Sequence, residues 1–276
     1  MRVKYSVIFM MVILILIFFT VSYNIVNNKR VRVTKENVLI DDLPEVFDGF
    51  TILQISDLHE KEFGENQEHL INTINEINYD IVAITGDMQN ENLQNDEPLL
   101  ALLDGIKNKK YIFYVSGNDG PKFSVKLEDK GCISLDTPYE IKRGNSSIMI
   151  YDFYDGSTFK DDAKDFDSDV VLGITHYPWK ESFYDTAKDK IGKYDLVIAG
   201  HYHGGQIRIP FYGALFVPDI NGDGFLPNQD DVSGLKTYGE YKQYISKGLG
   251  ASSEKGVTGF RLFNAPEINL ITLVND

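Results

Sequence analysis

The chain has a single cysteine, Cys132, so no disulfide can form within it. Cysteine usage therefore does not indicate the redox compartment. A set of thiolates of the kind that holds a structural zinc ion is also missing. Basic residues are scarce, because 27 Lys and Arg stand against 41 Asp and Glu, which gives a formal net charge of -14. A nucleic-acid-binding surface, which needs clustered Lys and Arg, is therefore not expected.

Charged residues are absent from Ser6 to Tyr23, a run of mostly Ile, Val, Leu, Phe and Met. This run is just long enough to span a bilayer as a helix. Small residues of an A-x-A-like cleavage site are missing after it, which favours an uncleaved anchor over a signal peptide. We therefore predict a single-pass protein of the cell membrane, anchored by one transmembrane helix within residues 1–27. Basic residues flank the run on both sides, so the side of the membrane that holds the rest of the chain stays open.

The rest of the chain contains no internal repeat or low-complexity tract, and its size suits one α/β domain. We assign residues 28–45 to a linker with an edge strand and residues 46–276 to the domain. Short apolar runs that are typical of buried strands occur at Thr51–Ser56, Asp80–Thr85, Tyr111–Ser116, Val170–Thr175 and Leu196–Ala199. Gln67–Ile77 has the periodicity of an amphipathic helix. Alternating strands and helices indicate an α/β fold with a largely parallel sheet.

Metal-ligating side chains follow each of these apolar runs. They lie in Asp57-Leu58-His59, Gly86-Asp87, Gly117-Asn118, His176 and Gly200-His201-Tyr202-His203-Gly204-Gly205-Gln206. Ligands in such folds gather at the carboxyl ends of the strands, so residues far apart in sequence can meet there. The sequence therefore predicts one site built from all five segments.

Seven candidate ligands are too many for one tetrahedral ion and suit two ions that share a carboxylate. They are Asp57, His59, Asp87, Asn118, His176, His201 and His203. Asp87, at a tight Gly turn, is the natural bridge. Imidazole and carboxylate ligands together suit Mn, Fe, Zn or Co. Two such ions can activate water and bind the oxygens of a phosphoryl group, so hydrolysis of a phosphate ester is the leading reaction class.

These blocks resemble, in order, the pattern of the calcineurin-like metallophosphoesterases. The resemblance extends roughly from Asp48 to Leu273. It is closest to the membrane-associated bacterial branch that includes UDP-2,3-diacylglucosamine pyrophosphatase-like proteins. It rests on the blocks Ile55-Ser56-Asp57-Leu58-His59, Gly200-His201-Tyr202-His203-Gly204-Gly205-Gln206, Lys247-Gly248-Leu249-Gly250 and Pro266-Glu267-Ile268.

The resemblance implies a four-layer α/β/β/α sandwich with a dinuclear centre between its two sheets. One ion would be bound by Asp57, His59, Asp87 and His203. The other would be bound by Asp87, Asn118, His176 and His201, so Asn118 and His176 also belong to the catalytic group. The implied nucleophile is a bridging water or hydroxide, and no side chain attacks.

The chain departs from the family pattern directly after Asn118. Many members have a histidine there that contacts the phosphate or protonates the leaving group, whereas this chain has Asp119. An ionised Asp repels a phosphate, while a protonated one can act as a general acid, and nearby cations lower its pKa. We expect Asp119 to alter or slow the chemistry and to favour good leaving groups such as pyrophosphate.

Two further segments are candidate binding sites. Arg208 could pair with a substrate phosphate, and a surface or strand-edge role suits it equally well. Asp219, Asn221 and Asp223 match the start of a calcium loop, with Asp230 at the twelfth position. No helix is evident before this loop, so we favour a Gly-rich acidic loop over a weak calcium site.

The leading hypothesis is a membrane-anchored, metal-dependent phosphoesterase that cleaves a phosphoester or pyrophosphate in a lipid-linked or envelope substrate. A broad phosphodiesterase or phosphomonoesterase acting on soluble nucleotides is the enzyme alternative. A catalytically weakened metal-binding scaffold is the alternative outside enzymes, and Asp119 is the residue that favours it.

Overall fold

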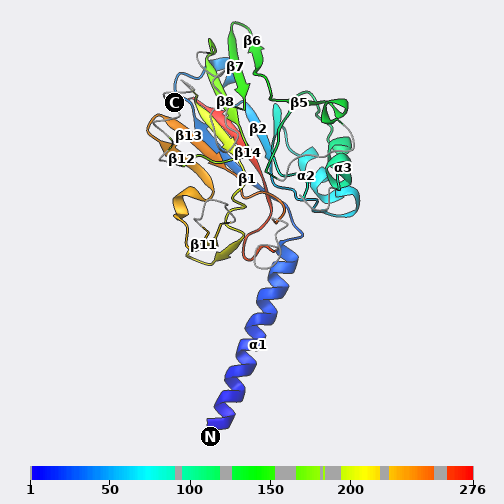
Figure 1. Cartoon of the computed structure of the whole chain (residues 1–276), viewed down its shortest axis with the longest axis vertical. Coiled ribbons are helices and arrows are strands. Elements are labelled where there is room, and N and C mark those ends of the chain that lie inside the picture. The colour runs from blue at the N-terminus through cyan, green and yellow to red at the C-terminus, as the bar shows by residue number, and fades with distance from the viewer. Residues whose placement is uncertain are drawn as a thin grey trace.

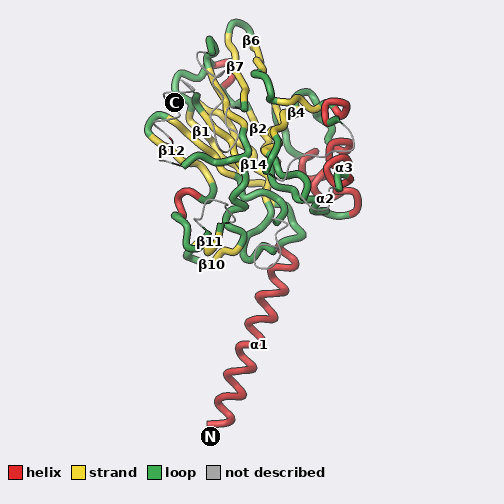
Figure 2. Tube along the Cα trace, in the orientation of Figure 1, coloured by secondary structure: helices red, strands yellow, loops and turns green. Residues whose placement is uncertain are grey.

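The computed structural model describes residues 2–90, 95–118, 126–152, 166–180, 183, 194–217, 224–251 and 260–275. A long N-terminal helix, α1 (Arg2–Asn27), projects from a domain that contains two six-stranded sheets (Figure 1). Figure 2 shows the other α-helices on one flank of the domain, away from the axis of α1. The fold of the described residues is therefore mixed α/β, and the long apolar helix α1 extends away from the domain.

The first sheet has the strand order β1-β14-β2-β3-β4-β5. Its strands are β1 (Arg32–Leu39), β14 (Glu267–Val274), β2 (Thr51–Ile55), β3 (Ile81–Thr85), β4 (Ile112–Val115) and β5 (Cys132–Ser134). Strands β2 to β5 are parallel to one another. Strand β14 is antiparallel to β2 and parallel to β1. The last strand in sequence therefore lies inside the sheet, between two strands from the beginning of the chain.

The second sheet has the order β12-β13-β9-β8-β7-β6. Its strands are β12 (Gly234–Tyr238), β13 (Tyr241–Ile245), β9 (Leu196–Ala199), β8 (Val170–Ile174), β7 (Ser146–Tyr151) and β6 (Tyr139–Arg143). The four central strands are parallel, and both outer strands are antiparallel to their neighbours. A separate hairpin consists of β10 (Ile207–Ile209) and β11 (Gly213–Phe216). The parallel strands expected from the sequence are thus divided between two mixed sheets.

The five apolar runs in the sequence form β2, β3, β4, β8 and β9, which confirms those strand predictions. Every residue of β3, β8 and β9 is buried. Burial on both faces explains why these strands are continuous apolar runs without alternation.

The two sheets pack on each other through one apolar core. Ile52 and Phe113 of the first sheet and Ile150 and Ile198 of the second belong to it, and all four are fully buried. A second core lies on the other face of the first sheet, where Leu70 and other apolar residues of two helices pack. These helices are α2 (Glu68–Asn75) and α3 (Glu97–Gly105).

The predicted helix at Gln67–Ile77 is shorter in the structure and begins at Glu68. Gln67 has a left-handed backbone with φ of 64°, so it cannot continue the helix toward the N-terminus. Short 3-10 segments complete the described helical elements: η1 (Glu45–Phe47), η2 (Glu65–Gln67), η3 (Leu127–Lys130) and η6 (Gln229–Asp231). Among the described residues no α-helix covers the outer face of the second sheet, so the fourth layer of the implied sandwich stays a prediction.

Candidate metal centre

The predicted ligands of the described segments meet where the parallel strands of both sheets end. Asp57 and His59 follow β2, Asp87 follows β3 and Asn118 follows β4 in the first sheet. His176 follows β8, while His201 and His203 follow β9 in the second. The strands within each set are parallel, so their carboxyl ends lie at one edge and the loops beyond them converge. Seven residues from five loops are thereby brought to one place.

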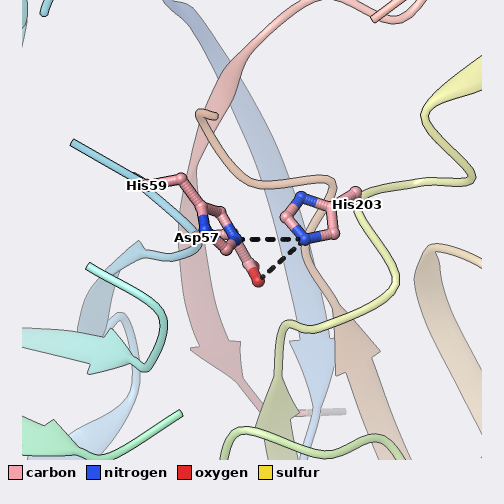
Figure 3. Close-up of side chains that lie close together, drawn as sticks. All are labelled: Asp57, His59 and His203. Atoms are coloured by element: carbon pink, nitrogen blue, oxygen red, sulfur yellow. Dashed lines mark hydrogen bonds and ion pairs between the residues drawn. The ribbon is translucent and has the colours of Figure 1, made fainter. Parts of the chain in front are cut away.

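The first group consists of Asp57, His59 and His203, which are all buried and whose ligand atoms lie within 4.8 Å of one another. Figure 3 shows the three side chains pointing toward one another, with Asp57 and His59 on the loop after β2 and His203 on the loop after β9. Nε2 of His203 lies 3.3 Å from Nε2 of His59 and 3.6 Å from Oδ1 of Asp57.

The second group consists of Asp87, His176 and His201, which are also all buried. Nε2 of His176 lies 3.1 Å from Nδ1 of His201. The side-chain oxygen of Asn118 lies 2.9 Å from the first of these nitrogens and 3.0 Å from the second. Asn118 therefore joins this group although it is neither a histidine nor a carboxylate.

Asp87 lies between the two groups. Its Oδ2 is 3.4 Å from Nε2 of His176 and 3.7 Å from Nε2 of His59. One carboxylate therefore reaches a histidine of each group. This is the position that a bridging ligand between two ions requires.

The spacing of the nitrogen atoms fits bound cations. Two nitrogens that each lie about 2.1 Å from one ion, at an angle of about 90 to 110°, are about 3.0 to 3.4 Å apart. The His59–His203 and His176–His201 pairs, at 3.3 and 3.1 Å, lie within that range. Imidazole, carboxylate and amide oxygen together form a donor set for Mn, Fe, Zn or Co. The residues present therefore fit two divalent transition-metal ions.

Hydrogen bonds behind the ligands orient two of the imidazoles. Nδ1 of His176 donates to the carbonyl oxygen of Thr85 at 2.8 Å. Nδ1 of His59 lies 3.1 Å from Oδ1 of Asn90, whose Nδ2 donates to the carbonyl oxygen of His59. When either ring is neutral, a proton on Nδ1 leaves the lone pair of Nε2 directed at the centre.

Burial and neighbouring charges set the protonation of the site. Burial lowers the pKa of His176, but the Asp87 and Asp57 carboxylates outweigh that effect and raise it to about 9. Burial lowers the pKa of His201 to about 3 and that of His203 well below its ordinary value. Burial raises the pKa of Asp57, whose Oδ2 accepts a 2.5 Å hydrogen bond from Ser56 Oγ. Two of the imidazoles are thus neutral and can donate lone pairs, while buried carboxylates require a compensating positive charge.

Five of the seven ligands have a left-handed backbone. The φ angles are 51° at Asp57, 46° at His59, 49° at Asp87, 70° at His201 and 50° at His203. Residues other than glycine rarely adopt this conformation, and such strain is concentrated at functional sites. The loops therefore hold these five residues in an unfavourable backbone conformation, and their side chains converge on one point.

Two glycines of the motifs are required for close approach. A Cβ at Gly117 would overlap Oδ1 of Asp87, and a Cβ at Gly200 would overlap Oγ of Ser56. Neither position has room for a side chain. The Gly in front of Asn118 therefore allows two loops of the first sheet to meet at Asp87, and the Gly in front of His201 allows a loop of the second sheet to meet the Asp57 loop.

Of the other predicted site residues, Arg208 is described by the structure and is not part of this cluster. Arg208 is half-buried on β10, and its Nη1 donates to the carbonyl oxygen of Gly204 at 2.6 Å, beside the His203 loop. Asp119 lies outside the described residues, and so do Asp219, Asn221 and Asp223 of the candidate calcium loop. Their roles stay predictions.

Sequence reasoning missed the residues that hold the His203 loop from behind. Asn264 Nδ2 donates to the carbonyl oxygen of His203 at 2.7 Å. The guanidinium of Arg261, which is buried, donates to the carbonyl oxygens of Gly250, Lys247 and Asn264 at 2.6, 2.8 and 3.0 Å. Neither residue belongs to a ligand motif. Their only signal in the sequence is an Arg and an Asn shortly before the Pro266-Glu267-Ile268 block.

The calcineurin-like phosphoesterase family model matches residues 50–205, which is more than half of the 276-residue chain. The matched segment contains all seven candidate ligands. The chain therefore belongs to the calcineurin-like phosphoesterase family.

Relatives of similar length come from bacteria. The uncharacterized metallophosphoesterase YkuE of Bacillus subtilis is 26% identical over 270 residues, which cover 88% of this chain and 85% of the relative. The uncharacterized metallophosphoesterase YkoQ of the same organism is 28% identical over 257 residues, with 88% and 90% coverage. The phosphodiesterase YaeI of Escherichia coli is 35% identical over 81 residues, or 29% of this chain and 26% of the relative.

Proposed function

We propose that this chain is a dinuclear, metal-dependent phosphohydrolase anchored in a membrane, and that it cleaves a phosphoester or pyrophosphate in a lipid-linked or envelope substrate. The observation that supports dinuclear chemistry best is the position of Asp87. Its Oδ2 lies 3.7 Å from His59 and 3.4 Å from His176, which belong to different ligand groups. A single ion would leave one of these groups without a cation.

Each group has a distinct part in the proposed site. His59 and His203 direct Nε2 lone pairs at one position, and His176 and Asn118 direct donor atoms at the other. Two divalent ions at these positions, each Mn, Fe, Zn or Co, would supply activated water and polarise the phosphoryl oxygens. Burial of the ligands excludes bulk water around them, so the charge of the ions would be weakly screened there.

Helix α1 supports the membrane part of the proposal. Residues Tyr5–Asn27 contain an 18-residue window with a mean hydropathy of 2.6, and none of that window is buried against the domain. At about 1.5 Å per residue such a span is longer than the hydrocarbon core of a bilayer, which is about 30 Å thick. An exposed apolar helix of this length is costly in water, and a bilayer removes that cost.

The substrate class rests on this tether and on the resemblance to UDP-2,3-diacylglucosamine pyrophosphatase-like proteins. An enzyme tethered to a membrane encounters substrates at the membrane surface more often than it encounters soluble substrates. The local similarity to the phosphodiesterase YaeI supports including phosphodiesters among the candidate bonds.

Hydrolysis by the full-length protein in detergent micelles tests the proposal. The protein is loaded with Mn²⁺ and offered phosphomonoesters, phosphodiesters and pyrophosphate esters, and bound metal is counted by mass spectrometry. Asp87→Ala should bind less metal, and its turnover should be lower by at least about a hundredfold. His69→Ala is the matched control, since His69 is an exposed residue of α2 outside the site.

Wild-type protein that binds two ions and turns over one of these ester classes, with turnover lost in Asp87→Ala, supports the proposal. Full metal loading with no turnover on any ester contradicts it and favours a metal-binding scaffold. An Asp119→Asn variant in the same assay decides whether that residue takes part in the reaction, since an unchanged rate would remove it from the mechanism.

A further inference from the structure

Large apolar side chains are exposed on the β10–β11 hairpin and on the segment beside it. Phe225 is 73% exposed, Leu226 is 63% exposed, and Phe211 is fully exposed. Ile209 and Tyr212 are also exposed. We call these five residues the hairpin patch. Exposed apolar clusters of this kind mark surfaces that bind another apolar body.

The residues of the hairpin patch are carried by one paired backbone scaffold. Ile209 ends β10, and Phe211 and Tyr212 form the turn into β11. On the other side of β11, Phe225 is bridged to Phe216, and the ring centroids of these two residues are 5.0 Å apart. The amide of Leu226 donates to the carbonyl oxygen of Leu215 at 2.8 Å. Backbone pairing therefore holds the apolar side chains on one small scaffold.

The same scaffold is hydrogen-bonded to the segment that holds the end of α1. The amide of Arg208 donates to the carbonyl oxygen of Leu262, and the amide of Leu262 donates to that of Gln206, at 2.9 and 3.0 Å. One residue further on, the amide of Phe263 donates to Oδ1 of Asn24 in α1 at 2.6 Å. The rings of Phe263 and Tyr23 lie 5.8 Å apart, so contacts between side chains reinforce the attachment.

A second hydrogen bond fixes the direction in which α1 leaves the domain. Nδ2 of Asn28 donates to the carbonyl oxygen of Arg261 at 2.9 Å. Strand β1 starts only a few residues later, at Arg32, so no long linker separates the helix from the sheet. Figures 1 and 2 show the β10–β11 hairpin at the end of the domain from which α1 leaves. The orientation of α1 therefore sets the orientation of the hairpin.

A bilayer spanned by α1 would have its surface close to this end of the domain. The apolar span ends at Asn27, and the next residues, Asn28, Lys29 and Arg30, are polar or basic, with Lys29 and Arg30 exposed. Basic residues after an apolar span lie at the level of the lipid headgroups. Aromatic side chains also concentrate at that level. The hairpin patch is rich in aromatic residues and lies at the end of the domain from which α1 leaves, so it is suited to a second contact with the same bilayer.

We propose that the hairpin patch inserts into the headgroup region of the bilayer that α1 spans, so that the domain is held by two contacts. This inference rests on the membrane anchoring in the proposed function. A second contact restrains the tilt of the domain and its rotation about the axis of α1 more tightly than the helix alone does.

The second contact narrows the substrate class. Strand β10 begins four residues after His203, and Asn264, next to Phe263, donates to the His203 carbonyl oxygen at 2.7 Å. The loop of one candidate metal ligand is thus connected to both membrane contacts. The substrate that suits this arrangement is an amphiphile whose acyl chains stay in the bilayer while its phosphoester or pyrophosphate reaches the metal centre.

The docking is tested with the full-length protein in vesicles of phosphatidylcholine and phosphatidylglycerol, with and without bromine on the upper acyl chains. Phe211→Trp places a fluorophore on the patch, and the native Trp179 is buried. The added fluorescence of Phe211→Trp should fall by about half in brominated vesicles, since interfacial insertion reaches about 5 to 10 Å.

Val46→Trp is the matched control. Val46 is 49% exposed and lies in η1, near the C-terminal end of the chain, where the amide of Asn275 donates to Asp48. Figure 1 shows that chain end on the opposite side of the domain from α1. Val46→Trp should be unaffected by bromine, and equal quenching at positions 211 and 46 would overturn the docking.

The substrate class is tested with one pair of esters that differ only in acyl length. Wild-type protein and a Phe211→Ser, Phe225→Ser, Leu226→Ser variant are compared on diacylglycerol pyrophosphate with hexanoyl chains and with oleoyl chains. The variant should lose about tenfold on the vesicle-bound long-chain ester and nothing on the soluble one. An equal loss on both esters, or a loss on neither, overturns the preference for a bilayer substrate. If the wild type turns over neither ester, this substrate class is also overturned. The quenching result needs no turnover and decides the docking separately.

Discussion

The side-chain amide of Asn264 donates a 2.7 Å hydrogen bond to the backbone carbonyl oxygen of His203. Both residues are buried. Asn264→Ala leaves that carbonyl without its partner, so the free energy of unfolding should fall by about 1 to 3 kcal/mol. Loss of support behind a ligand should also weaken metal binding by about tenfold or more. Urea unfolding and competition with a fluorescent chelator measure the two effects.

Asn37→Ala is the control for this prediction, because Asn37 is exposed on β1 and far from the ligands in the fold. An Asn264→Ala protein that matched Asn37→Ala in both measurements would show that the bond does not support the loop.

Gly117→Ala should disable the site without unfolding the domain. The added methyl group overlaps Oδ1 of Asp87, so the carboxylate must move. A displacement of about 1 Å in a catalytic arrangement can reduce turnover about a hundredfold. Metal content and turnover of the purified protein test this expectation. Gly144→Ala strains a left-handed turn (φ 63°) but brings the new methyl group within 4 Å of no atom, so this variant should keep both.

The Glu267 carboxylate should make stability depend on pH in the acid range. Burial raises its pKa, but Lys247, whose Nζ lies 2.9 Å away, and hydrogen bonds from Asn269 and Thr34 outweigh this and lower it below its ordinary value of 4.5. Because the folded pKa is depressed, this stabilisation is complete well above pH 4.5 and is lost as pH falls through the folded pKa. Glu267→Gln should lower the melting temperature at pH 7 and have a smaller effect at low pH.

Melting curves of wild type and Glu267→Gln across pH 3 to 8 give this comparison. A difference that stays constant over the whole range would mean that the charge of Glu267 contributes nothing to stability. Glu140→Gln is a suitable control, since Glu140 pairs with Lys142 on an exposed part of β6.

Removal of metal should destabilise the domain as well as stop turnover. Asp57 and Asp87 are both buried, and without cations the positive charges that act on them include protonated His176 and, for Asp57, the Arg261 guanidinium. A ligand present at about a hundred times its dissociation constant stabilises the folded state by about 2.7 kcal/mol. Chelation should therefore lower the melting temperature, and Mn²⁺ should restore it.

Asp87→Ala separates specific from general effects of Mn²⁺. The melting temperature of this variant should respond weakly to added metal, because the ligand between the two groups is missing. A response equal to that of the wild type would place the bound ions elsewhere on the protein.

The sequence predicts those parts of the fold that depend on local pattern. The runs that form β3, β8 and β9 are apolar at nearly every position, because both faces of these strands are buried. A strand buried on both faces has this continuous apolar pattern whatever its position in the sheet. The ligand motifs were equally visible, because each one follows such a strand directly. The structure brings together all seven residues that these motifs named.

Pairing between distant strands could not be predicted in the same way. Nothing in the alternation of Glu267–Val274 specifies that it pairs with both β1 and β2, since a strand pattern shows a buried face and no partner. The support of His203 by Asn264 was hidden for a similar reason, because a hydrogen bond across 61 residues leaves no local periodicity. The hairpin patch escaped notice because apolar residues in a sequence do not reveal whether they are exposed.

The place of β14 between β1 and β2 determines when the domain can be completed during protein synthesis. The ribosome releases α1 and β1 first and β14 last, and the first sheet has no substitute for β14 until then. The facing edges of β1 and β2 therefore stay open for as long as the chain is growing. Unpaired edges invite pairing with other chains, so nascent chains and products truncated before Glu267 would be the aggregation-prone forms of this protein.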